Sequence, residues 1–324
     1  MRTFLSVSLR LCVRQSFFLL PALAALTMTS TAAAQAGTFE WHTHSSEAGS
    51  RRYKLFVPAS VDARRDAPLV VMLHGCTQDP DDFARGTRFN QVAAERGVIV
   101  AWPEQPASHH PQKCWGWYDP ANQGTLPGEP GLIAGITREV MDALQIDRRR
   151  VYIVGVSAGA AMAVSTAAGY PELYAAVGAH SGIPYRAAAD VPHAIAVMRN
   201  GSPDPAILAY ALQDALGDGR PPALIAVHGG ADAVVTATNS RQLAAQWAGV
   251  LGLSASPAER TTEGGLGVER TRWKAADGTT AIELVVVDSL GHAWSGGAPE
   301  GTYTDARGPD AARLVLDFLL AHHR

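Results

Sequence analysis

Short apolar runs alternate with longer amphipathic stretches along most of the chain. Continuous runs of Val, Ile, Leu and Ala are typical of strands that are buried on both faces of a parallel sheet. Such runs predict strands at Tyr53–Val57, Leu69–Leu73, Val98–Trp102, Val151–Val156, Ala175–Ala179, Ala223–Val227 and Ile282–Val287. The stretches between them predict helices at Arg88–Arg96, Gly131–Leu144, Ala158–Gly169, Ser240–Leu251 and Pro309–His322.

A second pattern near the carboxyl end predicts a hairpin. The segment Val268–Val287 has Asp277-Gly278 in its middle, and this dipeptide favours a tight turn between antiparallel strands. Together these elements predict an α/β fold with a mostly parallel, doubly wound sheet flanked by helices. In such folds the functional loops follow the carboxyl ends of the strands.

Residues 1–36 differ from the rest of the chain. Arginines precede an apolar run at 17–28, and small residues follow up to Ala36. This pattern predicts a signal peptide over 1–36 and a secreted protein, extracellular or periplasmic. The run is too short for a membrane anchor, and it contains Pro21. Residues 37–324 show no repeat and no linker, so we expect them to form a single domain.

Composition excludes several classes of protein. The chain has 324 residues, of which 47% are hydrophobic and 18% charged, with a formal net charge of −3. These values exclude a disordered polymer and argue against a nucleic-acid partner. The sequence has neither a four-ligand Cys/His spacing nor a Gly-rich dinucleotide loop, so we expect no metal and no organic cofactor.

The strongest chemical signal is Gly155-Val156-Ser157-Ala158-Gly159. A predicted buried strand runs directly into this pentapeptide and a predicted helix follows it. In that context G-x-S-x-G predicts a sharp turn that holds a nucleophilic serine hydroxyl above the sheet. The two glycines are needed because side chains there would collide with neighbouring backbone.

A serine hydroxyl needs a base, and the base needs an orienting carboxylate. We expect the base to be His292, which lies in the loop between the last predicted strand and the final helix. Other histidines fit this place less well; they are His74, His109, His110, His180, His228, His322 and His323. We expect the acid to be Asp232, which follows a predicted strand and a glycine turn, with Asp288 as the alternative. Asp204, in a Pro-rich stretch, is expected to be a turn residue.

An acyl-transfer site also needs donors for the oxyanion. The predicted strand Leu69–Leu73 leads into His74-Gly75-Cys76. We expect the backbone N–H groups of Cys76 and Ala158 to be the donors, and His74 to bond the loop backbone rather than carry a proton.

With these residues assembled, the chain resembles the polyhydroxybutyrate depolymerase family of esterases, to which feruloyl and acetylxylan esterases are related. The resemblance rests on segments spread over residues 73–297. They are Leu73-His-Gly-Cys-Thr-Gln78, Trp102-Pro-Glu-Gln105, Lys113-Cys-Trp-Gly-Trp-Tyr118, Gly155-Val-Ser-Ala-Gly-Ala160, His180-Ser-Gly182 and Gly291-His-Ala-Trp-Ser-Gly-Gly297.

The resemblance implies an α/β-hydrolase fold and a Ser-His-Asp carboxylic-ester hydrolase with Ser157, Asp232 and His292 in the triad positions. The expected substrates are hydroxyalkanoate esters, with plant cell-wall feruloyl or acetylxylan esters as the alternative. Family members that attack solid polymer usually carry a linker and a substrate-binding domain after the catalytic domain. We expect no such domain here, because only one predicted helix follows His292, and this favours soluble esters, oligomers or amorphous material. A peptidase and a non-catalytic binding protein on the same scaffold are further alternatives.

Aromatic side chains gather in the loops near the predicted site. They are Phe83, Trp115, Trp117, Tyr118 and Trp294. We expect the last four of them to contact substrate.

Removal of a leader would take Cys12 with it and leave an even number of cysteines. The remaining pair, Cys76 and Cys114, is predicted to form a disulfide in an oxidising compartment.

Overall fold

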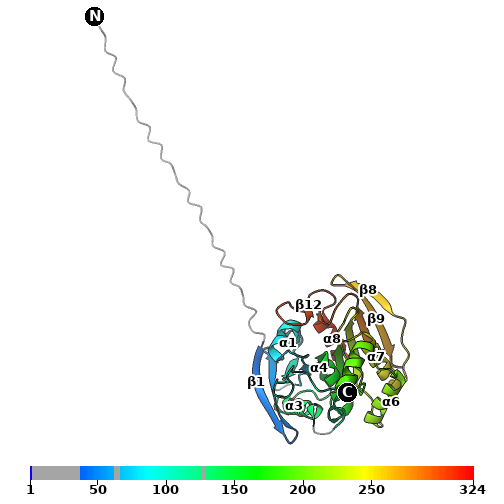
Figure 1. Cartoon of the computed structure of the whole chain (residues 1–324). Helices are drawn as coiled ribbons and strands as arrows, with labels where there is room; N and C mark the ends of the chain where they lie inside the picture. The colour runs from blue at the N-terminus through cyan, green and yellow to red at the C-terminus, as the bar shows by residue number, and fades with distance from the viewer. Residues whose placement is uncertain (2–36, 62–65, 126–127) are drawn as a thin grey trace. The chain divides into compact units, whose positions relative to one another are not determined.

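A ten-stranded mixed sheet with the order β1-β2-β4-β3-β5-β6-β7-β10-β9-β8 forms the centre of the structure, with β1 and β8 at its opposite edges (Figure 1). This computed structural model describes Met1 and residues 37–61, 66–125 and 128–324, so the predicted leader lies outside the described residues. The strands of the sheet are β1 Gly37–Ser46, β2 Gly49–Pro58, β3 Leu69–Leu73, β4 Ile99–Pro103, β5 Val151–Val156, β6 Ala176–His180, β7 Ala223–Gly229, β8 Glu259–Glu263, β9 Leu266–Lys274 and β10 Thr280–Val287.

The middle of the sheet is parallel and its edges are antiparallel. Strands β4, β3, β5, β6, β7 and β10 run in the same direction, whereas β1, β2, β9 and β8 pair antiparallel with their neighbours. Strands β3 and β5 are buried at every position, which explains their continuous apolar sequences. The predicted fold class is confirmed, and so is the predicted hairpin, in which Val287 pairs with Val268.

Helices cover both faces of the sheet. The longer connections fold into α1 Pro80–Thr87, α2 Phe89–Arg96, α3 Glu129–Ala143, α4 Ala158–Gly169, α5 Val191–Asn200, α6 Pro205–Leu216, α7 Thr238–Leu251 and α8 Ala311–Leu320. Short elements complete the described part; they are a 3₁₀ turn at Pro120–Asn122 and the small pair β11 Trp294–Ser295 and β12 Thr304–Asp305. Apolar side chains of α3, α4 and α7 pack on one face, and those of α1, α2 and α8 on the other.

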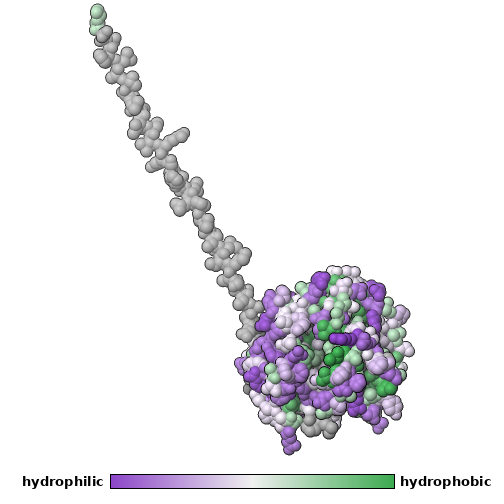
Figure 2. Space-filling model, viewed as in Figure 1, coloured by the Kyte–Doolittle hydropathy of each residue, from purple (hydrophilic) through white to green (hydrophobic). Residues whose placement is uncertain are grey.

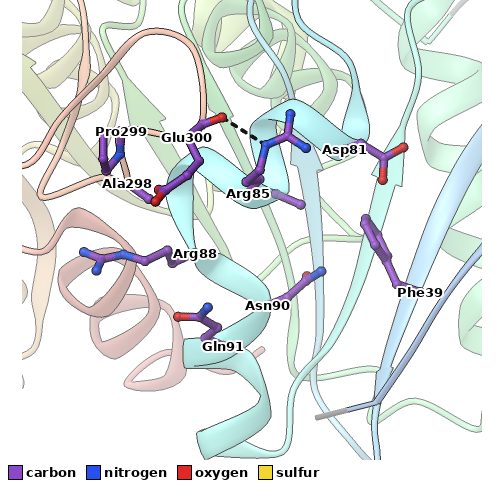
Figure 3. Close-up of a pocket in the computed structure, with 10 residues that line it drawn as sticks. Phe39, Asp81, Arg85, Arg88, Asn90, Gln91, Ala298, Pro299 and Glu300 are labelled. Carbon is purple, nitrogen blue, oxygen red and sulfur yellow. Dashed lines mark hydrogen bonds between the residues drawn. The ribbon is translucent and has the colours of Figure 1, made fainter. Parts of the chain in front are cut away.

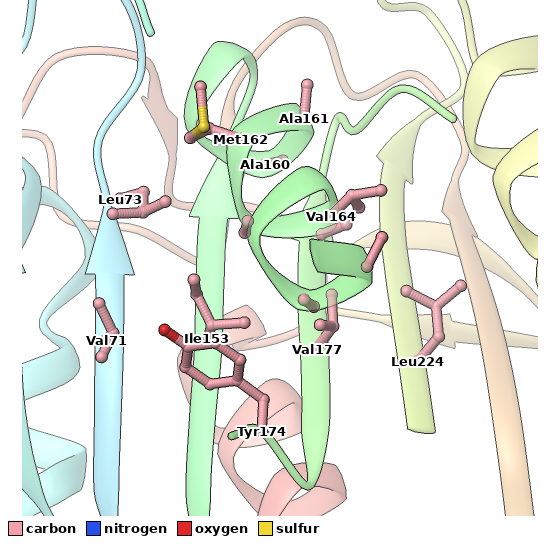
Figure 4. Packing of buried hydrophobic residues seen from close by; sticks show 14 of the residues in the cluster. Val71, Leu73, Ile153, Ala160, Ala161, Met162, Val164, Tyr174, Val177 and Leu224 are labelled. Atoms are coloured by element: carbon pink, nitrogen blue, oxygen red, sulfur yellow. The ribbon is translucent and has the colours of Figure 1, made fainter. Parts of the chain in front are cut away.

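Alternate residues of each central strand contribute to the two cores. In β3, Leu69, Val71 and Leu73 face α3 and α4, whereas Val70 and Met72 face α2 and α8. Helix α4 lies directly over the central strands, with its side chains above those of β5 and β6 (Figure 4). Every residue of α4 is buried, and its many Ala and Gly residues let the helix approach the sheet closely.

Several elements carry no strong hydrophobic period and were not predicted. Strands β1 and β8 are mostly exposed at the sheet edges, so their sequences read as polar and they depend on backbone pairing with β2 and β9. Helix α1 begins at a proline after Asp79, whose side chain accepts a hydrogen bond from the Asp82 N–H. Asp190 and Asp204 cap α5 and α6 in a similar way, with a proline at the second position of α5 and at the first position of α6.

Much of the surface in view is hydrophilic, with smaller hydrophobic areas between the polar side chains (Figure 2). Exposed large apolar side chains include Val191 and Ile195 on α5 and Ile207 and Tyr210 on α6. In the described ranges no helix combines the length and the hydrophobicity required to cross a membrane. The described residues from Gly37 to Arg324 belong to one compact unit.

Candidate active site

Ser157 lies at the sharp turn between β5 and α4. Its backbone has φ 56° and ψ −123°, a strained conformation for a residue with a side chain. A Cβ atom at Gly155 would lie 2.2 Å from the Gly159 oxygen, and one at Gly159 would lie 2.2 Å from the Leu73 oxygen. Only glycine fits at these two positions, and the turn therefore presents the serine side chain at the carboxyl end of the sheet.

The loops after β7 and β10 bring two further side chains to Ser157. The Ser157 hydroxyl donates to His292 Nε2 at 3.0 Å, and His292 Nδ1–H donates to Asp232 Oδ2 at 2.7 Å. The other Asp232 oxygen accepts the N–H groups of Val234 and Val235 at 2.9 and 2.8 Å. The structure thus brings together the three residues that the sequence places in the catalytic positions.

The environment of Asp232 favours its charged form. Burial by itself would raise the pKa of this carboxyl, but interactions with His228, His292 and the Val235 N–H hold the pKa well below its usual range. His228 is fully buried, its Nε2–H donates to the Val235 oxygen at 2.8 Å, and it lies 3.4 Å from Asp232 Oδ2. His292 therefore faces a carboxylate that stays ionised.

Four of the rival acids and bases interact with other partners. Asp288 is half exposed and faces Arg260, with 3.8 Å between the carboxylate and the guanidinium. Asp204 caps α6 by accepting the Ala206 N–H, as a turn residue would. His180 is buried under Trp294, and burial lowers its pKa to about 3. His322 bonds the backbone oxygens of Phe318 on α8 and Thr280 at the start of β10.

The predicted oxyanion donors lie in the loop after β3 and at the start of α4. In the part of the chain that the structure describes, neither the Cys76 N–H nor the Ala158 N–H has an acceptor within the protein. Ala158 is the first residue of α4, so its N–H points out of the helix start. Both residues line cavities that reach Ser157. These two amides are available to a bound oxyanion.

His74 bonds the backbone of this loop on both sides of its ring. Its Nδ1–H donates to the Gly75 oxygen at 2.7 Å, and its Nε2 accepts the Gln105 N–H at 3.0 Å. Burial lowers the pKa of His74 to about 4, which keeps the ring neutral. The adjoining disulfide joins Cys76 to Cys114.

A buried polar network supports the segment around Cys114. Gln105 Nε2 donates to the Cys114 oxygen at 2.9 Å and also bonds Glu129. Glu129 in turn accepts the Gly116 N–H at 2.7 Å, and burial raises the pKa of this carboxyl. Arg51 donates to Gln105 Oε1 at 2.6 Å. The loop beside the disulfide is therefore fixed to β2, β4 and α3.

The predicted aromatic contacts have different surroundings. Trp115, Trp117 and Tyr118 line an apolar cavity at Ser157, although Trp115 is fully buried and donates from Nε1 to the His74 oxygen at 3.0 Å. Trp294 is 1% exposed and stacks on His180, with 4.9 Å between the ring centres. It lines neither of the cavities that reach Ser157, and its ring packs against Phe83 of α1 and His180 of β6. A contact between Trp294 and substrate stays a prediction.

Two cavities, of about 240 and 270 Å³, reach Ser157. Sequence reasoning missed several residues that line them, among them Met198 on α5, Val234 after Asp232, and Tyr303. These residues belong to connections without a recognisable motif. A larger hollow of about 720 Å³ lies away from Ser157, between α1, α2 and residues 298–300, with charged side chains such as Arg85 and Glu300 around it (Figure 3). Within 37–61, 66–125 and 128–324, no group of three or more His, Cys, Asp or Glu could hold a metal ion.

Known structures share this fold. An acetyl xylan esterase from Aspergillus awamori superposes with a TM-score of 0.66 at 21% sequence identity, over 80% of this chain and 95% of that one. At this identity the likeness shows the fold alone.

Sequence relatives point to esterases. Poly(3-hydroxyalkanoate) depolymerase C of Paucimonas lemoignei is 29% identical over 239 residues, which cover 73% of this chain and 56% of the depolymerase. The chain thus matches little more than half the length of that relative. Feruloyl esterase B of Thermothelomyces thermophilus is 29% identical over 216 residues, 61% of this chain and 70% of that protein. The family model described as Esterase PHB depolymerase matches residues 51–269, more than half of the chain, and the chain therefore belongs to this esterase family.

Proposed function

We propose that the chain is a secreted serine carboxylic-ester hydrolase that acts on hydroxyalkanoate esters or oligomers. The observation that carries this proposal is the hydrogen-bonded series Ser157–His292–Asp232, with contacts of 3.0 and 2.7 Å. Membership of the esterase family supports the reaction type, and the poly(3-hydroxyalkanoate) depolymerase relative supports the acyl class.

The first half of the proposed reaction forms an acyl-enzyme. His292 Nε2 accepts the Ser157 proton as the oxygen attacks the ester carbonyl, and Asp232 stabilises the resulting imidazolium. The carbonyl oxygen becomes an oxyanion that accepts hydrogen bonds from the Cys76 and Ala158 N–H groups. One such donor is worth about 3 kcal/mol of barrier. The imidazolium then returns its proton to the departing alcohol oxygen.

The second half regenerates the enzyme. His292 accepts a proton from water, whose oxygen attacks the acyl carbon and displaces the Ser157 oxygen. The proton passes through His292 to Ser157, and the carboxylic acid leaves. His74 and His180 are assigned no proton transfer, because their buried ring nitrogens bond Gly75, Gln105, Ser181 and Ser295.

Feruloyl or acetylxylan ester hydrolysis is the alternative substrate class. Feruloyl esterase B is as similar in sequence as the depolymerase, at 29% identity, and the apolar cavity beside Trp117 and Tyr118 would accept a phenolic ring. The catalytic residues would be the same, so the alternatives differ in substrate and not in mechanism.

We also propose that residues 1–36 direct export and that the remaining chain is one catalytic domain. The disulfide between Cys76 and Cys114 supports an oxidising compartment. Mass spectrometry of the protein recovered outside the cytoplasm should give a mature chain that begins at Gly37. An uncleaved chain retained in the cytoplasm would contradict the export proposal.

A substrate panel tests the activity. We would measure turnover of p-nitrophenyl butyrate, a hydroxybutyrate trimer, methyl ferulate, acetylated xylan and amorphous polyhydroxybutyrate. We expect the hydroxybutyrate trimer to be the best natural ester, and Ser157→Ala to lose at least a thousandfold in kcat. Ser108→Ala, which removes an exposed hydroxyl outside the site, is the matched control. Undiminished turnover in Ser157→Ala would refute the mechanism, and a preference for methyl ferulate would favour the alternative.

A further inference from the structure

Two separate cavities meet at the Ser157 hydroxyl. Both are lined by Ser157, Cys76, Gln112 and Met198, and each then continues in its own direction. One cavity, of about 240 Å³, continues past His292, Val234 and Tyr303. The other, of about 270 Å³, continues past Ala158 towards α5 and the Trp117 loop. An ester has two arms, so the question is which arm enters which cavity.

The chemistry of the proposed mechanism fixes the answer. The alcohol oxygen must receive a proton from His292 Nε2, so the alcohol arm has to start beside His292. The carbonyl oxygen points towards the Cys76 and Ala158 amides. The acyl chain is the remaining substituent of the reacting carbon, and it must leave on the side away from His292. Of the two cavities, His292 lines only one, and Ala158 lines only the other.

We therefore propose that the cavity between α5 and the disulfide loop is the acyl subsite, and that the cavity beside Tyr303 is the alcohol subsite. This assignment rests on the proposed ester hydrolysis at Ser157. Met198 lines both cavities, so this assignment places its side chain between the acyl group and the alcohol group of the ester. The flexible, unbranched side chain of methionine suits a wall that adjusts to different esters.

The acyl subsite is apolar and larger than an acetyl group requires. The apolar residues that line it include Trp117, Tyr118, Ile183, Val191 and Ile195. A methyl group takes up about as much space as a water molecule, about 30 Å³, so acetate would leave most of this cavity unfilled. Each additional methylene that becomes buried should raise kcat/KM about fourfold. The subsite thus selects apolar acyl groups of about four to six carbons over acetyl.

The acyl wall formed by α5 is fixed to the catalytic acid loop. The Met198 oxygen accepts the Thr236 N–H at 2.8 Å, and the Val197 oxygen accepts Asn239 Nδ2–H at 2.9 Å. Thr236 follows closely on Asp232, whose own carboxylate holds the Val234 and Val235 amides. The loop that orients His292 therefore also sets the end of α5, and the cavity keeps its shape.

Matched tryptophan substitutions test the assignment. Ile195 lines only the acyl subsite, Val234 lines only the alcohol subsite, and Ile207 lines neither; their exposures of 47, 46 and 62% allow a larger side chain without disturbing the core. Acyl selectivity is the kcat/KM ratio of p-nitrophenyl hexanoate to p-nitrophenyl acetate. Alcohol selectivity is the ratio of butyl butyrate to methyl butyrate, followed by proton release.

We expect the unmodified enzyme to prefer hexanoate to acetate at least tenfold. Ile195→Trp should lower acyl selectivity at least tenfold and change alcohol selectivity less than twofold. Val234→Trp should do the reverse, and Ile207→Trp should change neither ratio. Effects exchanged between the first two variants, acetate preference in the unmodified enzyme, or equal effects of all three variants would overturn the assignment. Absence of turnover with every ester, by contrast, would refute the proposed function itself.

Discussion

Both oxygens of the Asp232 carboxylate are occupied, one by His292 and the other by the Val234 and Val235 N–H groups. Asp232→Asn keeps the shape of this side chain but presents an amide where His292 needs an acceptor. The imidazole would then lose its orientation and its counter-charge, so we expect kcat to fall about ten-thousandfold at neutral pH. The measurement is kcat for p-nitrophenyl butyrate.

Asp288→Asn is the matched control, because Asp288 is the nearest rival in the chain and faces Arg260 at the surface. This variant should keep kcat within twofold of the unmodified enzyme. A large loss in Asp288→Asn together with a small one in Asp232→Asn would transfer the role of the acid to Asp288.

His74 fixes the direction of the Cys76 N–H, one of the two proposed oxyanion donors. A trans peptide is planar, and its C=O and N–H point in opposite directions. His74 Nδ1–H holds the Gly75 oxygen at 2.7 Å, and this fixes the N–H of the next residue, Cys76, towards the opposite side. Gln105 N–H, which donates to Nε2, fixes the ring tautomer that makes the first bond possible.

Two substitutions test the two ring nitrogens of His74 separately. In His74→Asn the side-chain amide can replace Nδ1 and still donate to the Gly75 oxygen. In His74→Gln it can replace Nε2 but leaves that oxygen without its donor. We expect kcat to fall about a hundredfold or more in His74→Gln and less than tenfold in His74→Asn. Circular dichroism would show that both variants are folded, and equal kcat values in the two would contradict the orienting role.

At the scale of elements, the disulfide joins the loop after β3 to the loop before the Pro120–Asn122 turn. Cys76 and Cys114 are 38 positions apart, and a bond that closes such a loop stabilises the fold by about 3–4 kcal/mol on the chain-entropy model. We expect Cys114→Ser to lower the free energy of unfolding by about this amount, measured by urea denaturation. The effect on kcat should be smaller than the effect on stability, because Gln105 and Trp115 still connect the two loops in the folded protein.

Cys76→Ser is the matched variant, since it breaks the same bond from the other side. The two variants should lose equal stability, and excess reductant should lower the stability of the unmodified protein to theirs. If reduction left that protein as stable as before, the bond would not be the source of the difference.

The elements that could be predicted are those whose burial imposes a regular pattern. β3, β5 and α4 have the predicted bounds because strands and helices buried on all sides leave no room for charged residues, so their sequences are almost entirely apolar or small. β1 and β8 could not be predicted, since edge strands depend on backbone pairing with a neighbour. Helices α5 and α6 show only the start signals Asp190-Val191-Pro192 and Asp204-Pro205.

The same distinction applies to the site. Ser157, Asp232 and His292 can be located because each follows a recognisable strand, and the strand ends meet at one edge of the sheet. The direction in which a loop side chain points cannot be predicted in this way. Trp115 and Trp294 lie in similar aromatic loops, yet one lines a cavity at Ser157 and the other stacks on His180 beneath it. Met198 and Val234 reach the cavities from connections that carry no motif.

At the scale of the whole molecule, buried neutral histidines connect the stability of the fold to pH. Burial lowers the pKa of His74 to about 4 and that of His180 to about 3. In the unfolded chain both titrate near pH 6.5. Between the folded and unfolded pKa values, the unfolded chain binds protons that the folded protein does not bind, so acidification favours unfolding.

We expect the free energy of unfolding to fall as the pH is lowered from about 6.5 to 4, by up to about 1.4 kcal/mol per pH unit for each of these two histidines. Glu129 raises the free energy of unfolding as the pH falls towards its ordinary pKa. The reason is that burial raises its pKa, so the folded protein binds this proton at a higher pH than the unfolded chain does. Asp232 lowers the free energy of unfolding only when the pH falls below the pKa that it has in the unfolded chain, since its pKa in the folded protein is lower still. Urea midpoints from pH 7 to 4 would measure the net slope, and His74→Asn should remove about half of the histidine contribution. A free energy of unfolding that stayed constant down to pH 4.5 would show that His74 and His180 titrate alike in the folded and unfolded chain.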